Sequence, residues 1–193
     1  MNFLAHIYLS GDDELVKIGN FMADGIKGKQ YLDYPQAVQN GILLHRKIDD
    51  FTDSHPLFRQ SRKRLAPDYG HYSGVVTDMF YDYFLAKYWK NYCRQPLTDY
   101  AADFYHLLEK NSPLLNDRTQ KMLPYMQQEN WLSAYATHGG LQKILQQMDN
   151  RTGFRSGMRN AIVNLAKDEK LYEAEFFEFF PQVQEMAARF LAV

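Results

Sequence analysis

The segment GILLHRKIDDFTDSHP, residues 41–56, places histidine and aspartate side chains at helical spacing. His45 and Asp49 share one face of a helix, with Cβ atoms about 5–6 Å apart, and Asp53 continues the line by one further turn. An imidazole and a carboxylate that face the core together can hold a hard divalent cation and a bound water. The alternative is a plain hydrogen bond between His45 and Asp49, with Asp53 capping the next helix.

A second pair of carboxylates, Asp78 and Asp82, lies in the apolar segment VVTDMFYDYFLAKYW, residues 75–89. Aspartate is a poor residue for a helix interior, and a buried carboxylate without a partner is costly. The two like charges also repel each other at this spacing. We therefore expect a positive partner, which is either an arginine, such as Arg46, or a cation shared with His45.

Asp24 and His6 are two further candidates. Asp24 ends the segment GNFMADG one residue before Gly25, where a helix is expected to end. A negative charge at a helix C-terminus opposes the macrodipole, so helix stability does not explain Asp24. It is either a functional carboxylate or a carboxylate in a solvated loop. His6 lies among apolar residues and is either a ligand or an ordinary core histidine. We expect His71 to be an ordinary surface residue.

A run of positive charge occupies residues 59–64, with the sequence RQSRKR. The run contains no acidic residue, so it is either a solvated helix face or a docking patch for an acidic protein or a phosphate group. Its cations are Arg59, Arg62, Lys63 and Arg64.

Helices must position these side chains, because apolar residues recur at helical spacing along almost the whole chain. The pattern predicts an all-α fold, built as a single compact multi-helix domain over residues 1–193. In the first half we expect helices from Asp12–Glu14 to about Gly25, from Tyr34–Pro35 through Asp49, a short basic helix to Leu65, and an apolar helix over residues 75–92. In the second half we expect breaks near Pro96, Ser112–Pro113, Pro124, Gly139–Gly140 and Gly153, and a kink at Pro181 in the last helix.

Composition limits the remaining possibilities. The formal net charge is −1, so overall charge favours neither nucleic acid nor membrane as a partner. Cys93 is the only cysteine, which excludes an intramolecular disulfide and a zinc site built from cysteines. The N-terminal segment has the character of neither a signal peptide nor a membrane span, so a cytoplasmic location is expected. The sequence has no glycine-rich phosphate loop, no nucleophile elbow and no His-Glu-x-x-His motif.

Four blocks, MNFLAH, GNFMADGIKG, GILLHRKIDDFTDSHP and TDMFYDYFLAKYW, resemble the acyl carrier protein phosphodiesterase family in order and spacing. The resemblance implies an all-α fold distantly related to the HD phosphohydrolases. It also implies hydrolysis, dependent on Mn²⁺ or Mg²⁺, of the phosphodiester that joins 4′-phosphopantetheine to the serine of holo acyl carrier protein. The positions that carry over are His6, Asp24, His45, Arg46, Asp49, Asp53, Asp78 and Asp82.

The chain departs from the HD pattern in one respect, since none of its histidines is followed directly by aspartate. The ligand set must therefore be rearranged. We expect the cation to be held by Asp24, His45 and Asp78, with His6 or Asp49 as a further ligand. Arg46, or an arginine near it, is expected to bind a non-bridging phosphate oxygen, and Asp53 and Asp82 are expected to orient the ligands as a second shell. The basic helix with Arg59, Arg62, Lys63 and Arg64 would receive the acidic surface of the carrier protein.

Two other functions fit the same residues. One is a metal-dependent phosphohydrolase that acts on a nucleotide or a small phosphodiester and needs no docking patch. The other is a non-catalytic helical module that binds an acidic partner, in which arginines neutralise Asp78 and Asp82. The sequence does not set the oligomeric state.

Overall fold

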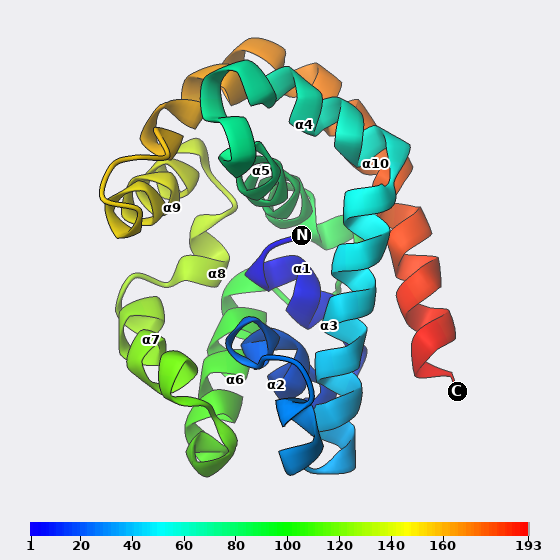
Figure 1. Cartoon of the computed structure of the whole chain (residues 1–193). Helices are drawn as coiled ribbons and strands as arrows, with labels where there is room; N and C mark the ends of the chain where they lie inside the picture. Colours follow the sequence, from blue (N-terminus) through cyan, green and yellow to red (C-terminus); the bar gives the residue numbers. More distant parts are fainter. Residues whose placement is uncertain (193) are drawn as a thin grey trace.

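The computed structural model describes residues 1–192 and shows helices and their connections over that range (Figure 1). The α-helices are α1 Phe3–Tyr8, α2 Glu14–Met22, α3 Gln36–Ser54, α4 Pro56–Tyr69, α5 Ser73–Lys87, α6 Leu97–Lys110, α7 Asp117–Gln128, α8 Trp131–Ala134, α9 His138–Arg151 and α10 Ala161–Leu191. The predicted all-α class is confirmed. The HD-like arrangement and the single-domain span stay predictions. Within the described residues, none of the helices combines the length and the apolar character needed to cross a membrane.

Local chemistry explains where the helices around the candidate residues begin. The side chain of Asp13 accepts hydrogen bonds from the backbone N–H groups of Leu15 and Val16, and α2 starts one residue after it. Pro35 directly precedes α3, and Pro56 is the first residue of α4, where a missing N–H costs nothing. The predicted starts of these three helices are confirmed.

Two helix ends in the first half differ from the prediction. The basic helix α4 does not stop at Leu65 but continues through Pro67 to Tyr69. Its end falls at Gly70, whose φ of 51° lies in the left-handed region that glycine adopts without strain. The helix α5 ends at Lys87 rather than near residue 92, and a 3₁₀ turn over Trp89–Asn91 takes up the rest. A proline late in a helix removes only one backbone hydrogen bond, so packing can sustain α4 beyond it.

One predicted break in the second half is wrong, because Pro124 lies inside α7. The break expected near Gly139–Gly140 is confirmed, since α8 ends at Ala134 and α9 begins at His138. Gly140 reflects a close contact, because a Cβ at this position would lie 1.9 Å from the carbonyl oxygen of Ala134. In α10 the non-helical dihedral angles occur at Asp168, while Pro181 is accommodated within the helix.

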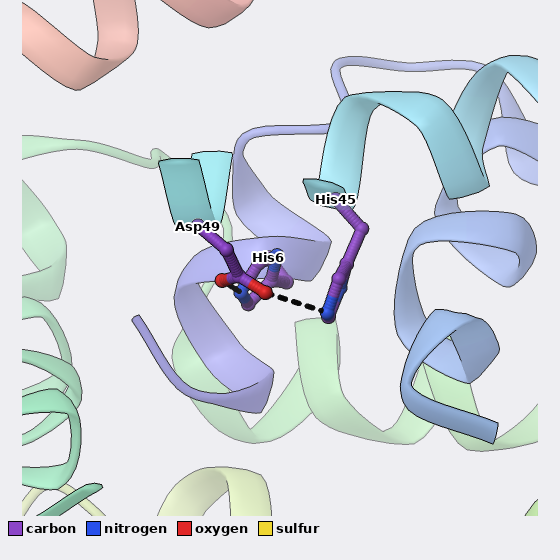
Figure 2. Close-up of side chains that lie close together, drawn as sticks. All are labelled: His6, His45 and Asp49. Atoms are coloured by element: carbon purple, nitrogen blue, oxygen red, sulfur yellow. Dashed lines mark ion pairs between the residues drawn. The ribbon is translucent and has the colours of Figure 1, made fainter. Parts of the chain in front are cut away.

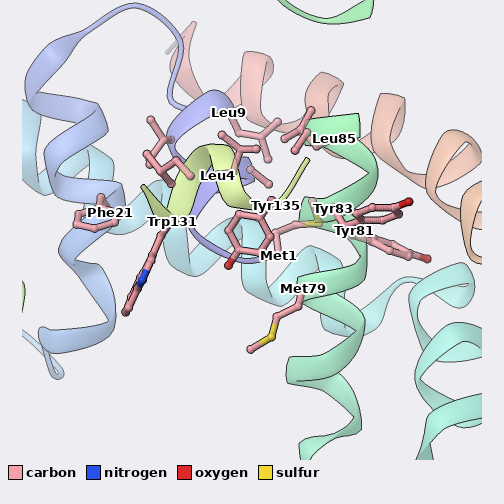
Figure 3. Packing of buried hydrophobic residues seen from close by; sticks show 14 of the residues in the cluster. Met1, Leu4, Leu9, Phe21, Met79, Tyr81, Tyr83, Leu85, Trp131 and Tyr135 are labelled. Carbon is pink, nitrogen blue, oxygen red and sulfur yellow. The ribbon is translucent and has the colours of Figure 1, made fainter. Parts of the chain in front are cut away.

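The helix α5 runs through the centre of the molecule and is buried on almost every side (Figure 1). Side chains such as Leu4 of α1 and Tyr135, which directly follows α8, pack around it (Figure 3). A helix that is apolar all round belongs in a core, and this position explains the poor amphipathicity of residues 75–89. It also buries Asp82 completely and leaves Asp78 partly exposed.

The helices α2 and α3 approach each other unusually closely. A Cβ at Gly19 would lie 2.1 Å from the carbonyl oxygen of Val38, and a Cβ at Gly41 would lie 2.2 Å from that of Val16. Only glycine permits this separation of backbones. The close crossing brings side chains of α2 directly against the histidine-bearing face of α3.

Candidate functional site

Three side chains from α1 and α3 form a compact cluster, which Figure 2 shows from close by. The imidazole rings of His6 and His45 stack, with centroids 4.0 Å apart and planes inclined by 22°. The Nε2 atom of His6 lies 3.2 Å from Oδ1 of Asp49, and the Nε2 atom of His45 lies 3.1 Å from Oδ2. One ligand atom from each residue can be chosen so that all lie within 4.8 Å of one another, the spacing that a shared metal ion requires. The predicted pairing of His45 with Asp49 along one helix face is confirmed, and His6 joins it.

Asn20 on α2 fixes the orientation of both imidazole rings. Its fully buried amide nitrogen donates hydrogen bonds to the carbonyl oxygen of His6 and to Oγ of Ser10, both at 2.9 Å. Its Oδ1 must therefore face the rings, where it lies 2.8 Å from Nδ1 of His6 and 3.1 Å from Nδ1 of His45. An amide oxygen only accepts, so both Nδ1 atoms carry the proton. Each ring, when neutral, then presents the lone pair of Nε2 to the cluster.

A lone pair that faces carboxylate oxygens needs a positive charge between them. The Nε2 atom of His45 is buried and forms no hydrogen bond, although oxygens of Asp49 and Asp24 lie 3.1 and 3.3 Å away. Imidazole nitrogens and carboxylate oxygens are suitable ligands for a divalent ion, and an Nδ1–H that donates to an amide is the support that ligating histidines ordinarily have. The residues present fit a divalent cation held by His6, His45 and Asp49.

Asp24 approaches this cluster from the 3₁₀ turn Ala23–Gly25, which follows α2. Its Oδ1 lies 3.3 Å from Nε2 of His45, and its Oδ2 lies 3.5 Å from Nη2 of Arg118 on α7. Asp24 is half exposed, which suits a carboxylate at the edge of a centre. The structure therefore places Asp24 beside His45, as expected for two residues that hold one cation.

The two histidines have opposite pKa shifts. Burial, together with the charge of His45, lowers the pKa of His6 to about 4. Burial also opposes protonation of His45, but the contacts with Asp24 and Asp49 outweigh it and raise the pKa of His45 to about 9. Burial works against ionisation of Asp49 as well, yet the two imidazoles hold its pKa far below the usual range. At neutral pH His45 is therefore the charged ring and His6 the neutral one, and with two carboxylates nearby the centre keeps a net negative charge.

The cluster opens into a cavity of about 410 Å³. Carboxylates, imidazoles and arginines from three different helices line it. Apolar side chains of Phe3, Phe21 and Met148 complete the wall. The charged and imidazole side chains that line it are His6, Asp24, His45, Asp49, Asp53, Arg62, His71, Asp78, Arg118 and Arg151. His71 therefore borders the cavity, whereas we expected an unrelated surface position.

The carboxylates of α5 have partners that the sequence did not suggest. Asp78 borders the cavity, but its Oδ1 accepts a hydrogen bond of 2.6 Å from the α-amino group of Met1, and burial raises the pKa of Asp78 to about 6. Asp82 is fully buried and accepts hydrogen bonds from the backbone N–H groups of Asn2, Leu4 and Ala5. Burial raises the pKa of Asp82 to about 7. Asp82 thus fixes the start of α1, which carries His6, while the positive group that contacts Asp78 is the α-amino group of Met1 rather than an arginine.

Arg46 points away from the cavity. Its Nη2 donates to the carbonyl oxygens of Ile26 and Gly28, and its guanidinium lies over the ring of Tyr31. Arg46 is therefore neither the partner of Asp78 nor close to the cluster. It fastens the connection that follows Asp24 onto α3.

The basic run on α4 divides into residues with different surroundings. Arg64 forms a forked pair with Glu175 of α10, and Nε of Arg59 donates to the backbone carbonyl of Asp53. Arg62 borders the cavity, and Lys63 is exposed. Of the predicted docking residues, Arg64 is thus engaged inside the protein, while the other three lie beside the cavity mouth or on the surface.

The sequence did not assign roles to Asn20, Arg118 or Arg151. Asn20 had one detectable signal, because it lies one helical turn before Asp24 on the same face. Arg118 and Arg151 have no local signal, since tertiary packing of α7 and α9 against the first half brings them to the cavity.

The fold and the site define an all-α protein with a buried histidine–carboxylate cluster at the floor of an open cavity. The model of the family described as acyl carrier protein phosphodiesterase matches residues 1–183, and the chain belongs to that family. Proteins named acyl carrier protein phosphodiesterase from Yersinia pestis and Pectobacterium atrosepticum are 29% and 27% identical to it, each over 97% of both chains. The protein of that name from Salmonella agona is 29% identical over 98% of both chains. No solved structure was found to match.

Proposed function

We propose that this protein hydrolyses the phosphodiester that joins 4′-phosphopantetheine to the serine of holo acyl carrier protein, with apo acyl carrier protein and 4′-phosphopantetheine as products. One observation carries the proposal: His6, His45 and Asp49 meet, with Asp24 beside them, at the floor of an open cavity. The names of relatives that match almost the whole chain supply the substrate.

We further propose that the cluster holds Mn²⁺ or Mg²⁺. His6, His45 and Asp49 would provide ligands, and Asp24 lies close enough to His45 to be another. Such an ion supplies Lewis acidity when bound, which activates water as a nucleophile and offsets the charge of the phosphodiester. The binding of a cation would also displace the second proton of His45, whose pKa is raised.

The protein's own side chains prepare this chemistry in advance. Asn20 holds both imidazole rings with Nε2 toward the cavity, and Asp82 holds the start of the helix that carries His6. Asp53 and Asp78 border the same cavity, where they can accept hydrogen bonds from water that is to attack. Groups fixed before the reaction need no reorganisation during it.

Arg59, Arg62 and Lys63 on α4 are proposed to receive the acidic surface of the carrier protein. Arg62 connects this patch with the cavity, because its side chain lines the wall. A carrier protein docked there would present its phosphodiester next to the cluster. Arg64 is omitted from the patch because Glu175 neutralises it. The distant relation to the HD phosphohydrolases and the cytoplasmic location stay predictions.

The direct test is incubation of the purified protein with holo acyl carrier protein and Mn²⁺, followed by mass spectrometry of the carrier protein. We expect loss of the 4′-phosphopantetheine arm, and no loss when a chelator replaces the metal. A small chromogenic phosphodiester is tested in parallel. Hydrolysis of this compound together with an intact carrier protein would contradict the proposed substrate, and an intact carrier protein with no hydrolysis at all would contradict the enzymatic function.

A further inference from the structure

Two arginines face the histidine–carboxylate cluster from the second half of the chain. Arg118 lies in the first turn of α7, and Arg151 is the last residue of α9. Both line the cavity that His6 and Asp49 line. Figure 1 shows α7 and α9 on the opposite side of the molecule from α3, and the two arginines that these helices bring to the cavity are called the cationic wall below.

Neither guanidinium has a hydrogen-bonded acidic partner among residues 1–192. Arg118 approaches Oδ2 of Asp24 to 3.5 Å without forming a hydrogen bond. Arg151 lies over the indole of Trp131, 4.9 Å from the ring centroid, and its Nη1 contacts only the sulfur of Met148. The guanidinium donors of this wall are therefore available to a ligand. In contrast, Arg64 uses two of its nitrogens on Glu175.

The two positive charges are also close enough to affect each other. Burial and the charge of Arg118 both lower the pKa of Arg151. Two like charges on one cavity wall repel each other. An anion bound between them is attracted by both and offsets this repulsion. Guanidinium groups recognise phosphate well, because their forked N–H donors match its oxygens.

We propose that Arg118 and Arg151 bind the non-bridging oxygens of the phosphodiester and hold it against the cluster. The identity of the ester rests on the proposed function, whereas the phosphate specificity follows from the two guanidiniums and their shared cavity. Arg118 has a second feature, since a cation bound at Asp24 would draw this carboxylate away and leave the guanidinium free for phosphate. Two residues from the second half of the chain would thus bind the phosphate oxygens that we expected Arg46 to bind.

Binding of inorganic phosphate provides a test that does not depend on turnover. Arg118→Gln and Arg151→Gln are compared with the native protein by calorimetry, with and without Mg²⁺. Arg94→Gln is the matched control, because Arg94 is exposed and lies outside this cavity. We expect each cavity variant to bind phosphate about tenfold more weakly, and the control to bind it as the native protein does.

Mn²⁺ affinity separates phosphate binding from a merely structural role. If Arg118 only positioned Asp24, Arg118→Gln would weaken Mn²⁺ binding. A phosphate-binding Arg118 predicts unchanged or tighter Mn²⁺ binding, because a repelling charge has been removed. Weaker Mn²⁺ binding together with unchanged phosphate affinity would overturn the proposal.

The last comparison uses holo acyl carrier protein. Turnover by the native protein, with equal phosphate affinity and equal kinetics in both cavity variants, would overturn the arginine site while the proposed function stands. Weaker phosphate binding in both variants, with no turnover by the native protein, would support the arginine site while the proposed function fails. A native protein that binds no phosphate in either condition would overturn the site.

Discussion

The protein contains two carboxylate centres, at Glu175 and at Asp49, whose negative charges are balanced in different ways. Glu175 on α10 is almost fully buried, and protein donors surround it: both terminal nitrogens of Arg64, the amide of Gln60 and the hydroxyl of Ser61. Asp49 on α3 faces the Nε2 atoms of two stacked histidines instead, at the floor of a cavity.

The difference shows how a structural centre and a candidate reactive centre can be distinguished. At Glu175 the compensating charge is part of the chain, so the centre is closed and complete. At Asp49 the chain supplies two imidazole rings, a second nearby carboxylate and open space, but only one positive charge, on His45. A centre of the first kind stabilises the fold, and a centre of the second kind is suited to take up a cation.

The largest effect is expected from His45→Ala. Loss of this ring removes a ligand and one of the two groups that hold Asp49, so turnover of holo acyl carrier protein should fall by about 10³-fold or more, which corresponds to about 4 kcal/mol of transition-state stabilisation. Turnover is read by mass spectrometry and Mn²⁺ binding by calorimetry. His106→Ala is the control, because that ring is exposed and lies outside the cavity. Retained Mn²⁺ affinity in the His45 variant would remove His45 from the proposed ligand set.

Glu175→Gln tests the closed centre. The substitution keeps the size of the side chain but leaves Arg64 without its counter-charge, and the free energy of unfolding should fall by about 3 kcal/mol. We take the lower end of the range for a broken buried pair, because the side chain of Arg64 is 22% exposed. Urea denaturation measures the change. Mn²⁺ affinity should not change, and a loss of Mn²⁺ binding would show that the two centres are coupled.

The sequence predicted the open centre better than the closed one, for a physical reason. His45 and Asp49 share a helix face, so a local pattern contains their geometry. The pair of Arg64 and Glu175 joins residues 111 positions apart in the chain, and no spacing rule relates them. For the same reason Arg64 looked like one more cation of a surface patch.

Helix identity was also predictable, whereas several ends and the short N-terminal helix were not. Apolar periodicity predicts long helices well, but α1 has only six residues. Its start also depends on the carboxylate of Asp82, which lies on α5. Pro67 and Pro124 suggested breaks that tertiary packing overrides. The partner of Asp78 could not be inferred either, because a backbone amino group leaves no pattern among side chains.

Asn20→Ala probes how the open centre is held in place. Without the amide oxygen, both Nδ1–H groups lose their acceptor, and the two rings are free to rotate or to change tautomer. We expect Mn²⁺ affinity to fall about 10–100-fold, the usual effect of removing a group that orients histidine ligands. The matched control is Asn164→Ala, which removes hydrogen bonds to Tyr69 and Asp68 far from the cluster. Equal Mn²⁺ affinity in the two variants would contradict an orienting role for Asn20.

The smallest effect is expected on α4, the helix that contributes both to the closed centre and to the proposed docking patch. Lys63 is exposed beside the engaged Arg64, so Lys63→Glu should leave stability and Mn²⁺ binding unchanged. The KM for holo acyl carrier protein should rise about threefold at low salt, because a rim charge contributes less than about 1 kcal/mol, and the difference should vanish as salt screens it. Lys167→Glu on α10 is the control for a charge reversal elsewhere on the surface. If both reversals raised KM equally, net charge rather than the α4 patch would govern recognition of the carrier protein.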